Sequence, residues 1–293
     1  MNEVTHCIGL DELLSAAGMA AGSVAGFEEI YEHIKSNPRL LTLAEEVEHR
    51  VQGYFTALEL PAQATMYDRL LLSLRSWDAV LTFNWDPFLF DAHRRNRGSI
   101  PLPGIYFLHG NVRIGTCRTG CTWGANGTVC PNCGEIYAKV PLVYPMKEKE
   151  YSDSYTRASW EHAQKLFASA FHLTIFGYSA PQSDQKARAL LHRAWASIRS
   201  RSFQHVDIID IEEDRLLRGR WSDFASEQYL HPMKDFAESR IARWPRRTCE
   251  AMKYPMRYGR PVEAFPFPHT EDLQALREMA YELARFESGV DAD

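Results

Sequence analysis

The sequence predicts an α/β protein with a mostly parallel sheet flanked by helices and a small cysteine-rich insertion. Short apolar runs rich in β-branched or aromatic residues occur at 79–83, 104–108, 173–176 and 206–211. Helical patterns separate these runs, at 88–95, 151–170 and 185–199. Strands that alternate with helices indicate parallel pairing, because the return to a parallel strand takes a long connection that a helix supplies. We therefore expect a Rossmann-like sheet.

The N-terminal part, residues 1–76, is predicted to be mainly helical. Apolar residues recur at three- and four-residue spacing in segments 27–35, 43–58 and 66–75. Pro38 and Pro61 separate these segments. We find no internal repeat and no low-complexity linker, so we expect a single domain over residues 1–293.

Composition narrows the class of protein. Hydrophobic residues make up 45% of the 293-residue chain and charged residues 24%, the balance of a globular protein in water. The net charge of -5 makes nucleic acid an unlikely partner, and the basic stretch 240–247 is expected to be a solvated helix end. No apolar run approaches the ~20 residues of a membrane span. The N-terminus lacks a secretion signal, so we expect a cytoplasmic protein.

A cluster of cysteines predicts a metal site in a module over residues 112–142. Cys117, Cys121, Cys130 and Cys133 have the spacing C-x3-C-x8-C-x2-C. In a reducing compartment such a cluster favours metal over disulfides, and paired thiolates suit tetrahedral zinc, with an iron–sulfur centre second. Four thiolates leave no open coordination position, so this zinc would be structural. The alternative is four unmetallated thiols in a loop.

Polar residues, or glycines that allow unusual backbone conformations, follow each predicted strand. The first run leads into Asn84-Trp85-Asp86 and the second into His109-Gly110. The third leads into Gly177-Tyr178-Ser179, and the fourth ends in Asp210 and Glu212. In open parallel sheets, ligands bind beyond the carboxyl ends of the strands. We therefore expect a small-molecule site at this edge.

At these residues the chain resembles the sirtuin-like (silent information regulator type) family, which consumes NAD. The similar segments are LTFNWDPFLFDA (81–92), FLHGNV (107–112), TIFGYSAPQSD (174–184) and IIDIEED (208–214). The four-cysteine module follows His109 within eight residues, as the zinc module of the family does. The resemblance runs from about residue 66 to 225 and suggests a divergent, bacterial-type member.

The resemblance implies catalytic roles at the first two strand ends. Asn84 would orient the nicotinamide ribose or the attacking water, because an amide donates and accepts without titrating. Asp86 would help to bind the nicotinamide end. His109 would act as general base, which imidazole can do near neutral pH. The structural alternative for Asn84 is a cap of the helix that begins near Pro87.

The resemblance also implies an NAD-binding role for the other two strand ends. Gly177, Tyr178 and Ser179 would approach the dinucleotide closely. Asp210 or Glu212 would accept hydrogen bonds from the adenosine ribose, although Asp210 could be an exposed strand-end charge. Ser183 and Asp184, by contrast, are interpreted as helix caps outside the site.

The N-terminus departs from the family pattern. Family members open with a buried strand and a glycine-rich loop that cradles the phosphates, whereas Gly18, Gly22 and Gly26 follow residues that look helical. Glycines four apart favour a helix packing surface. A strand and loop within residues 1–30 would favour catalysis, and helices alone would favour a protein that binds nucleotide without turnover.

Three functions are compatible with these observations. The preferred one is an NAD glycohydrolase that cleaves the nicotinamide–ribose bond, of the kind that stand-alone bacterial members use in stress or phage defence. The alternatives are an NAD-dependent protein-lysine deacylase and a catalytically silent protein that binds NAD or ADP-ribose. The expected partners are an NAD-like small molecule and either a second copy of the chain or a defence-system protein.

Overall fold

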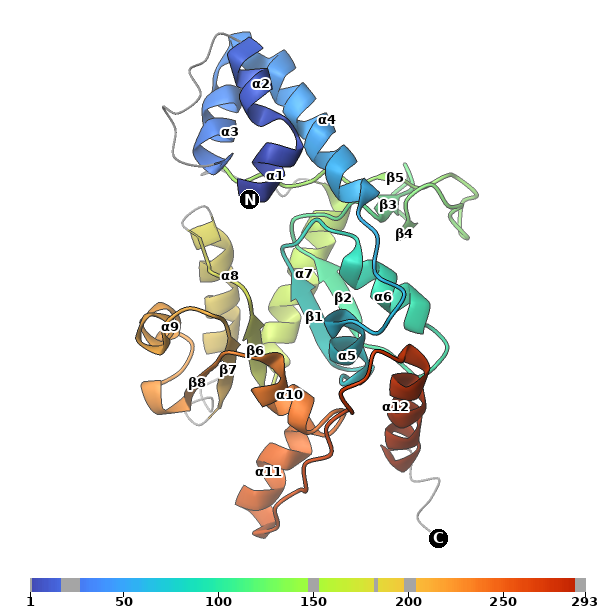
Figure 1. The fold of residues 1–293 in the computed structure, drawn as a ribbon, viewed down its shortest axis with the longest axis vertical. Coiled ribbons are helices and arrows are strands. Elements are labelled where there is room, and N and C mark those ends of the chain that lie inside the picture. The colour runs from blue at the N-terminus through green and yellow to red at the C-terminus, as the bar shows by residue number, and fades with distance from the viewer. Residues whose placement is uncertain (1, 17–26, 147–152, 182–183, 198–203, 288–293) are drawn as a thin grey trace.

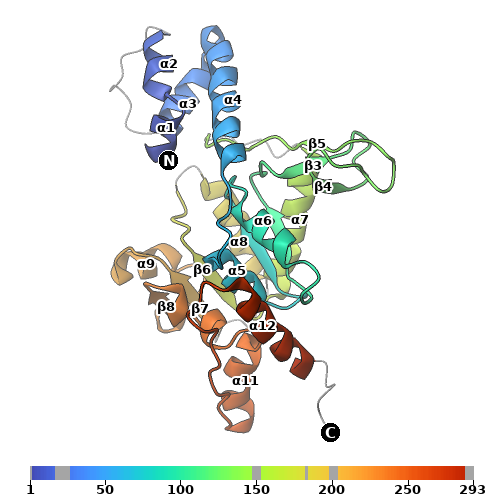
Figure 2. The same ribbon diagram turned by 45° about the vertical axis from the view of Figure 1, so that its right-hand side comes forward.

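The computed structural model describes residues 2–16, 27–146, 153–181, 184–197 and 204–287. Figure 1 shows N-terminal helices at one end, a central part built from parallel strands and helices, and C-terminal helices at the other end. The view in Figure 2 shows the small antiparallel module beside the central part. No helix among the described residues is long and apolar enough to cross a membrane.

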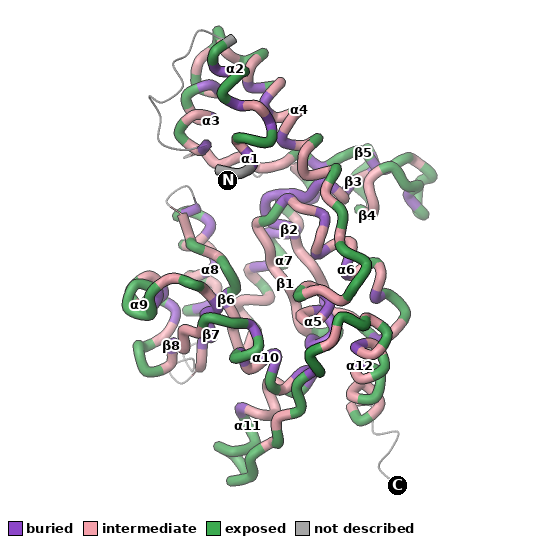
Figure 3. Tube along the Cα trace, in the orientation of Figure 1, coloured by how far each residue is buried: buried purple, intermediate pink, exposed green. Residues whose placement is uncertain are grey.

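The N-terminal helices pack around a core of their own. They are α1 (Asn2–Cys7), α2 (Leu10–Ala16), α3 (Phe27–Ser36), the short 3-10 helix η1 (Pro38–Leu40) and α4 (Leu41–Ala57). Figure 3 shows buried and exposed stretches alternating along these helices. Along α4 the buried positions Ala44, Val47 and Val51 recur every three to four residues. They face the buried Phe27 and Tyr31 of α3, so periodic burial of one face holds these helices together.

The first pair of parallel strands follows α5 (Met66–Leu72). It consists of β1 (Ala79–Thr82) and β2 (Gly104–Phe107), joined by α6 (Phe88–Asn96). The pairing sets Ala79 opposite Gly104 and Thr82 opposite Phe107. The two helices next to these strands are also joined. The fully buried carboxylate of Asp68 in α5 accepts hydrogen bonds from Arg95 and Asn96 of α6.

The second parallel ladder lies further along the chain. Its strands are β6 (Leu173–Phe176), β7 (Val206–Ile209) and β8 (Leu230–Met233), in that order across the ladder. The helices that precede and connect them are α7 (Ser154–Ser169), α8 (Gln185–Ala196), α9 (Asp214–Trp221) and the 3-10 helix η4 (Glu227–Tyr229). Every residue of the central strand β7 is buried. The predicted α/β fold with parallel strands flanked by helices is confirmed.

The strand pairing differs from the expected single sheet in two respects. Among the described residues, the parallel strands form two ladders rather than one. The sequence also did not reveal β8, because its LHPM segment carries a histidine and a proline that interrupt the apolar run. Pro232 is tolerated there because β8 ends the ladder, where one side needs no backbone donor.

Side chains join the two ladders into one body. Val80 of β1 packs in one cluster with Ile209 of β7. Beyond the strands, the rings of Phe83 and Tyr178 stack with their centroids 4.5 Å apart. From α7, Trp160 donates its indole N–H to the carbonyl of Leu108 at 3.0 Å. The carboxyl ends of both ladders are therefore held close together.

The cysteine-rich module is a small antiparallel sheet between the two parallel ladders in the chain. It contains β3 (Ile114–Thr116), β4 (Trp123–Ala125) and β5 (Ala138–Lys139), with β3 in the middle. On its return the chain passes over the end of β2, where the Val143 N–H donates to the carbonyl of His109 at 2.9 Å. The module is therefore tied to the end of the strand that carries His109.

The C-terminal segment corrects the interpretation of the basic stretch 240–247. It comprises the 3-10 helix η5 (Phe236–Glu238), α10 (Arg240–Arg243), α11 (Thr248–Tyr258) and α12 (Leu273–Glu287). Arg240 pairs with the buried Asp207 of β7. Arg246 is buried, pairs with Glu287 of α12 and donates to the carbonyl of Leu74. Two of these arginines therefore hold the C-terminal helices to the central part and do not form a solvated surface.

A cluster of polar side chains lies at the amino ends of β7 and β8. His172 Nε2 lies 3.5 Å from the Asp207 carboxylate, and a ring nitrogen of His205 lies 2.6 Å from one of His231. Burial raises the pKa of Asp207, but hydrogen bonding from His172 and the charge of Arg240 outweigh it and lower that pKa. Burial and the charge of Arg240 lower the pKa of His231 to about 4. The opposite end of β7 leads into the predicted ligand residues Asp210 and Glu212.

Candidate functional site

The ends of β1 and β2 place the first predicted site residues beside each other. Because Thr82 lies opposite Phe107, the chain leaves both strands at the same level. The Leu108 N–H extends the ladder with a hydrogen bond to the Thr82 carbonyl at 2.8 Å. Asn84 therefore follows β1, and His109 follows β2, at one edge of the ladder.

At the start of α6 the side chain that accepts a backbone N–H is that of Asp86 and not that of Asn84. The Phe88 N–H donates to Asp86 Oδ1 at 3.1 Å. Asn84 is exposed, and its hydrogen bonds within the described residues are made by its backbone: its N–H donates to Thr82 Oγ1 at 3.1 Å, and its carbonyl accepts from the Asn111 side chain at 3.5 Å. Burial raises the pKa of the Asp86 carboxyl, and the hydrogen bond from the Phe88 N–H offsets this rise only in part. The capping alternative for Asn84 is therefore wrong, and its amide faces solvent at the strand end.

Asn111 is a residue of this edge that the sequence interpretation missed. It is fully buried, and its side-chain N–H donates to the Asp86 carbonyl at 2.6 Å. Its Oδ1 accepts the Arg113 N–H at 2.9 Å. Asn111 thus fixes the path of the Asn84–Asp86 loop from the neighbouring strand end. The available signal was its position two residues after His109.

Trp85 connects the same loop to the N-terminal helices. Its side chain is only 8% exposed and belongs to their core. Its ring packs edge-on against Phe55 of α4 at 5.8 Å and lies 4.9 Å from the ring of Tyr144. Its backbone carbonyl accepts the Val112 N–H at 3.2 Å. Trp85 therefore attaches the Asn84–Asp86 loop to the N-terminal helices.

His109 lies in a nearly closed environment that includes an acidic residue. His109 is 6% exposed, and the ring of Phe83 packs edge-on against its imidazole at 4.8 Å. His109 Nε2 lies 3.8 Å from Oδ1 of Asp184, which is 5% exposed. Asp184 precedes α8 but makes no side-chain cap hydrogen bond. Its interpretation as a helix cap outside the site is therefore corrected, whereas Ser183 lies outside the described residues.

The loop after β6 approaches the same place. Gly177 has φ +60°, a backbone conformation that favours glycine, and its N–H continues the ladder to the Ile209 carbonyl at 2.9 Å. The Tyr178 ring stacks on Phe83, and its hydroxyl donates to Asp184 Oδ2 at 3.1 Å. Ser179 is exposed. Of the three predicted residues of this loop, Tyr178 is therefore the one linked to the surroundings of His109.

The two acidic residues after β7 are engaged in local contacts. Asp210 is half-buried, and its Oδ1 accepts the Glu212 N–H at 3.0 Å, so it is not simply an exposed charge. Glu212 pairs with Arg220 of α9 at 2.5 Å. Asp210 directly follows Ile209, whose carbonyl accepts the Gly177 N–H, so the loop after β6 and the end of β7 are neighbours.

The described part of residues 1–30 is helical. It comprises α1, α2 and the beginning of α3. Gly18, Gly22 and Gly26, the loose counterparts of a phosphate loop, lie outside the described residues. A strand at this edge from residues 2–16 is therefore ruled out.

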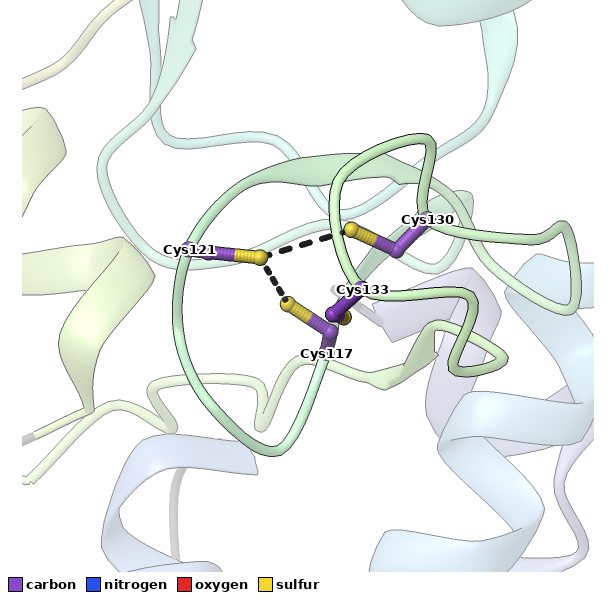
Figure 4. Close-up of side chains that lie close together, drawn as sticks. All are labelled: Cys117, Cys121, Cys130 and Cys133. Carbon is purple, nitrogen blue, oxygen red and sulfur yellow. Dashed lines mark hydrogen bonds between the residues drawn. The ribbon is translucent and has the colours of Figure 1, made fainter.

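The four cysteine sulfurs converge on one point. Their Sγ atoms all lie within 4.8 Å of one another, and Figure 4 shows the sulfur of Cys121 facing those of Cys117 and Cys130. Neighbouring sulfurs are 3.1 and 3.5 Å apart. Tetrahedral zinc with Zn–S bonds of about 2.3 Å would place its sulfurs about 3.8 Å apart, so small adjustments would suffice. The arrangement can hold one metal ion.

The pKa values of these thiols also fit a cation site. Burial raises the pKa of Cys130, but hydrogen bonds from Thr122 and the backbone outweigh it and lower it to about 5. A hydrogen bond from Thr119 lowers the pKa of Cys121, but the neighbouring sulfurs outweigh it and raise it to about 12. Crowded thiols resist joint ionisation unless a positive charge is added, which a metal ion supplies.

Two surface hollows lie away from this edge. One, of about 540 Å³, is lined by Arg218, Ser226, Glu227 and Gln228. The other, of about 400 Å³, is lined by Cys7, Ile8, His49, Arg50, Gly53 and Tyr54. Neither contains the strand-end residues, so the chemistry of the edge and not the depth of a hollow identifies the candidate site.

Fold and site together define an α/β protein with polar residues gathered at the carboxyl ends of its parallel strands and with a four-cysteine centre that can hold a metal. The chain matches no known family model and no curated protein. Among solved structures it is similar to a mutant of a Sir2 homologue in complex with ADP-ribose. That similarity has 14% identity and a TM-score of 0.43, and covers 82% of this chain and 90% of the other. A likeness of this degree assigns no function.

Proposed function

We propose that this protein is an NAD-consuming hydrolase of the sirtuin-like type that cleaves the nicotinamide–ribose bond. The observation that carries the proposal is the common position of Asn84, Asp86 and His109 at one strand edge. Asn84 has an exposed amide that does not cap the following helix. An amide, a carboxylate and an imidazole at one edge supply the groups that binding a ribose and activating water require.

The chemistry follows from these three side chains. When the bond between the ribose C1′ and the nicotinamide nitrogen breaks, its electron pair leaves with nicotinamide and an oxocarbenium-like centre remains. The Asn84 amide would orient the water that attacks this centre. His109 would accept the proton that the water releases, so the products are nicotinamide, ADP-ribose and one proton. Asp86 would help to hold the nicotinamide end.

We assign a structural zinc ion to Cys117, Cys121, Cys130 and Cys133, with an iron–sulfur centre as the second candidate. Four thiolates would fill its coordination sphere, so the ion would carry out no chemistry. What zinc supplies here is folding free energy for a module with few buried residues of its own. Because the module returns across His109, its stability also supports the proposed base.

The direct test is release of nicotinamide and ADP-ribose from NAD. We expect turnover by the wild type and a loss of about 100-fold or more in Asn84→Ala and in His109→Ala. Gln228→Ala is a matched control, because it removes an exposed amide away from the edge and should leave turnover unchanged. No release by the wild type, or full activity of Asn84→Ala, would contradict the proposal.

A second candidate is a catalytically silent protein that binds NAD or ADP-ribose. It is favoured by the helices over the described part of residues 1–30, since residues 2–16 supply no strand leading into a phosphate-binding loop. Calorimetry that shows binding of NAD or ADP-ribose, together with no turnover, would support this candidate. NAD-dependent loss of acetyl groups from peptides would instead support a lysine deacylase. The defence role and any protein partner stay predictions.

A further inference from the structure

Asp184 has no role in the proposed cleavage, although it lies beside the proposed base. Its carboxylate and the His109 imidazole are both nearly buried, and His109 Nε2 lies 3.8 Å from Asp184 Oδ1. A buried carboxylate is stable only with partners that satisfy its charge and its hydrogen bonds. The ring of His109 is such a partner whenever it carries a proton.

The position of Asp184 is fixed by Tyr178. The Tyr178 hydroxyl donates to Asp184 Oδ2 at 3.1 Å, which leaves Oδ1 toward His109. The Tyr178 ring stacks on Phe83, whose ring also packs against His109. Phe83 and His109 follow the first ladder, and Tyr178 and Asp184 follow β6 of the second. The two ladders therefore meet at this carboxylate.

A helix cap does not explain these contacts. Asp184 occupies the residue before α8, but its side chain makes no cap hydrogen bond there. Its backbone N–H donates to the Pro181 carbonyl at 2.9 Å, so the turn at the start of α8 is made by the backbone. The carboxylate can therefore be exchanged for an amide of the same shape without removing the turn.

We propose that Asp184 is the positioning residue for His109, an inference that rests on the proposed NAD cleavage. When His109 accepts the proton of the attacking water, the ring becomes an imidazolium cation. The Asp184 carboxylate, 3.8 Å from His109 Nε2, stabilises the charge of that cation and so favours the ring orientation that faces it, while Tyr178 orients the carboxylate. No further group has to gain or lose a proton in this step.

The test compares Asp184→Asn with the wild type, using two measurements. The first is a pH titration of the His109 ring by NMR of histidine-labelled protein without NAD, assigned with the spectrum of His109→Gln. We expect the midpoint of His109 protonation to fall by about one pH unit in Asp184→Asn, because an opposite charge is lost. The second is the pH profile of kcat/KM for nicotinamide release, which should fall about 10- to 1000-fold near neutral pH.

Two further variants separate positioning from folding. Asp214→Asn removes an exposed carboxylate on α9 that pairs with Lys234, and should leave both measurements unchanged. Tyr178→Phe keeps the ring stacked on Phe83 but removes the hydroxyl, and should give a smaller change in the same direction as Asp184→Asn.

Different results would contradict the positioning role and the proposed NAD cleavage. An unchanged His109 midpoint in a folded Asp184→Asn protein overturns the positioning role, whatever its activity. A wild type that releases no nicotinamide overturns the proposed function alone, because the titration needs no turnover. A lower kcat/KM with an unchanged midpoint also overturns the proposal, since it would indicate a structural defect.

Discussion

Replacing Trp85 with alanine should destabilise the protein and disturb the candidate site in one step. Trp85 stands between Asn84 and Asp86, but its side chain packs with Phe55 of α4 and with Tyr144. The N-terminal helices therefore hold the loop that presents the two polar residues. Removing the ring deletes the contacts between these helices and the loop but leaves the side chains of Asn84 and Asp86 unchanged.

The expected magnitude follows from burial and ring contacts. The Trp85 side chain is 8% exposed, so almost the whole indole leaves a cavity when it is truncated. Truncating a buried tryptophan lowers the free energy of unfolding by about 3–5 kcal/mol. The edge-on contact with Phe55 accounts for about 1 kcal/mol of this loss. We therefore expect a loss of about 4 kcal/mol, with lower NAD turnover in the protein that remains folded.

Urea unfolding followed by circular dichroism measures this loss. Trp77→Ala is the matched control, because that side chain is 68% exposed and its recorded ring contact is with the Arg75 guanidinium at 5.2 Å. It should cost less than about 1 kcal/mol. If Trp85→Ala is no more destabilised than Trp77→Ala, the anchoring of the loop by the N-terminal helices is wrong.

Three further predictions concern the metal centre, the strand end and the polar cluster. Cys130→Ser should lose bound zinc and melt several degrees lower, as measured by metal analysis and thermal unfolding. Gly110→Ala should lose about 3 kcal/mol or more of unfolding free energy, because φ is +75° and the new Cβ would lie 2.5 Å from the Pro141 carbonyl oxygen. His231 should make the protein less stable in acid. Its pKa of about 4 in the fold lies below 6.5, so the unfolded chain binds more protons between these values. The stability that it contributes above pH 6.5 should fall by about 1–2 kcal/mol as the pH drops to 4, after allowance for solvent screening.

Each of the three has a control or a contradicting outcome. Gly98→Ala also has a positive φ, of +90°, but meets nothing within 4 Å, so it should lose only about 1 kcal/mol. Equal losses in the two glycine variants would refute the clash with Pro141. Unchanged zinc content in Cys130→Ser would refute the metal assignment. A His231→Gln protein whose stability falls with acid as steeply as the wild type would show that His231 is not the group responsible.

Local patterns in the sequence determined the elements of the fold. Apolar runs at 79–83 and 206–211 mark β1 and β7, because strands covered on both faces of a parallel sheet are mostly apolar and can be recognised from the local sequence alone. The cysteine spacing likewise predicted the convergence of four sulfurs, because the paired thiols of each half lie within a few residues of one another. The apolar-run pattern failed to predict β8, because His231 and Pro232 interrupt the run.

Only the tertiary structure decided which polar residues meet. Asp184 looks like a helix cap in sequence, and its contact with His109 joins two distant parts of the chain that a local pattern cannot relate. Asn111 and Trp85 gained their roles in the same way, from packing against a neighbouring strand end and against α4. Spacing along the chain reports the short-range geometry of one element. The burial of a carboxylate beside an imidazole depends on how two separate ladders pack, and that is settled by the whole fold.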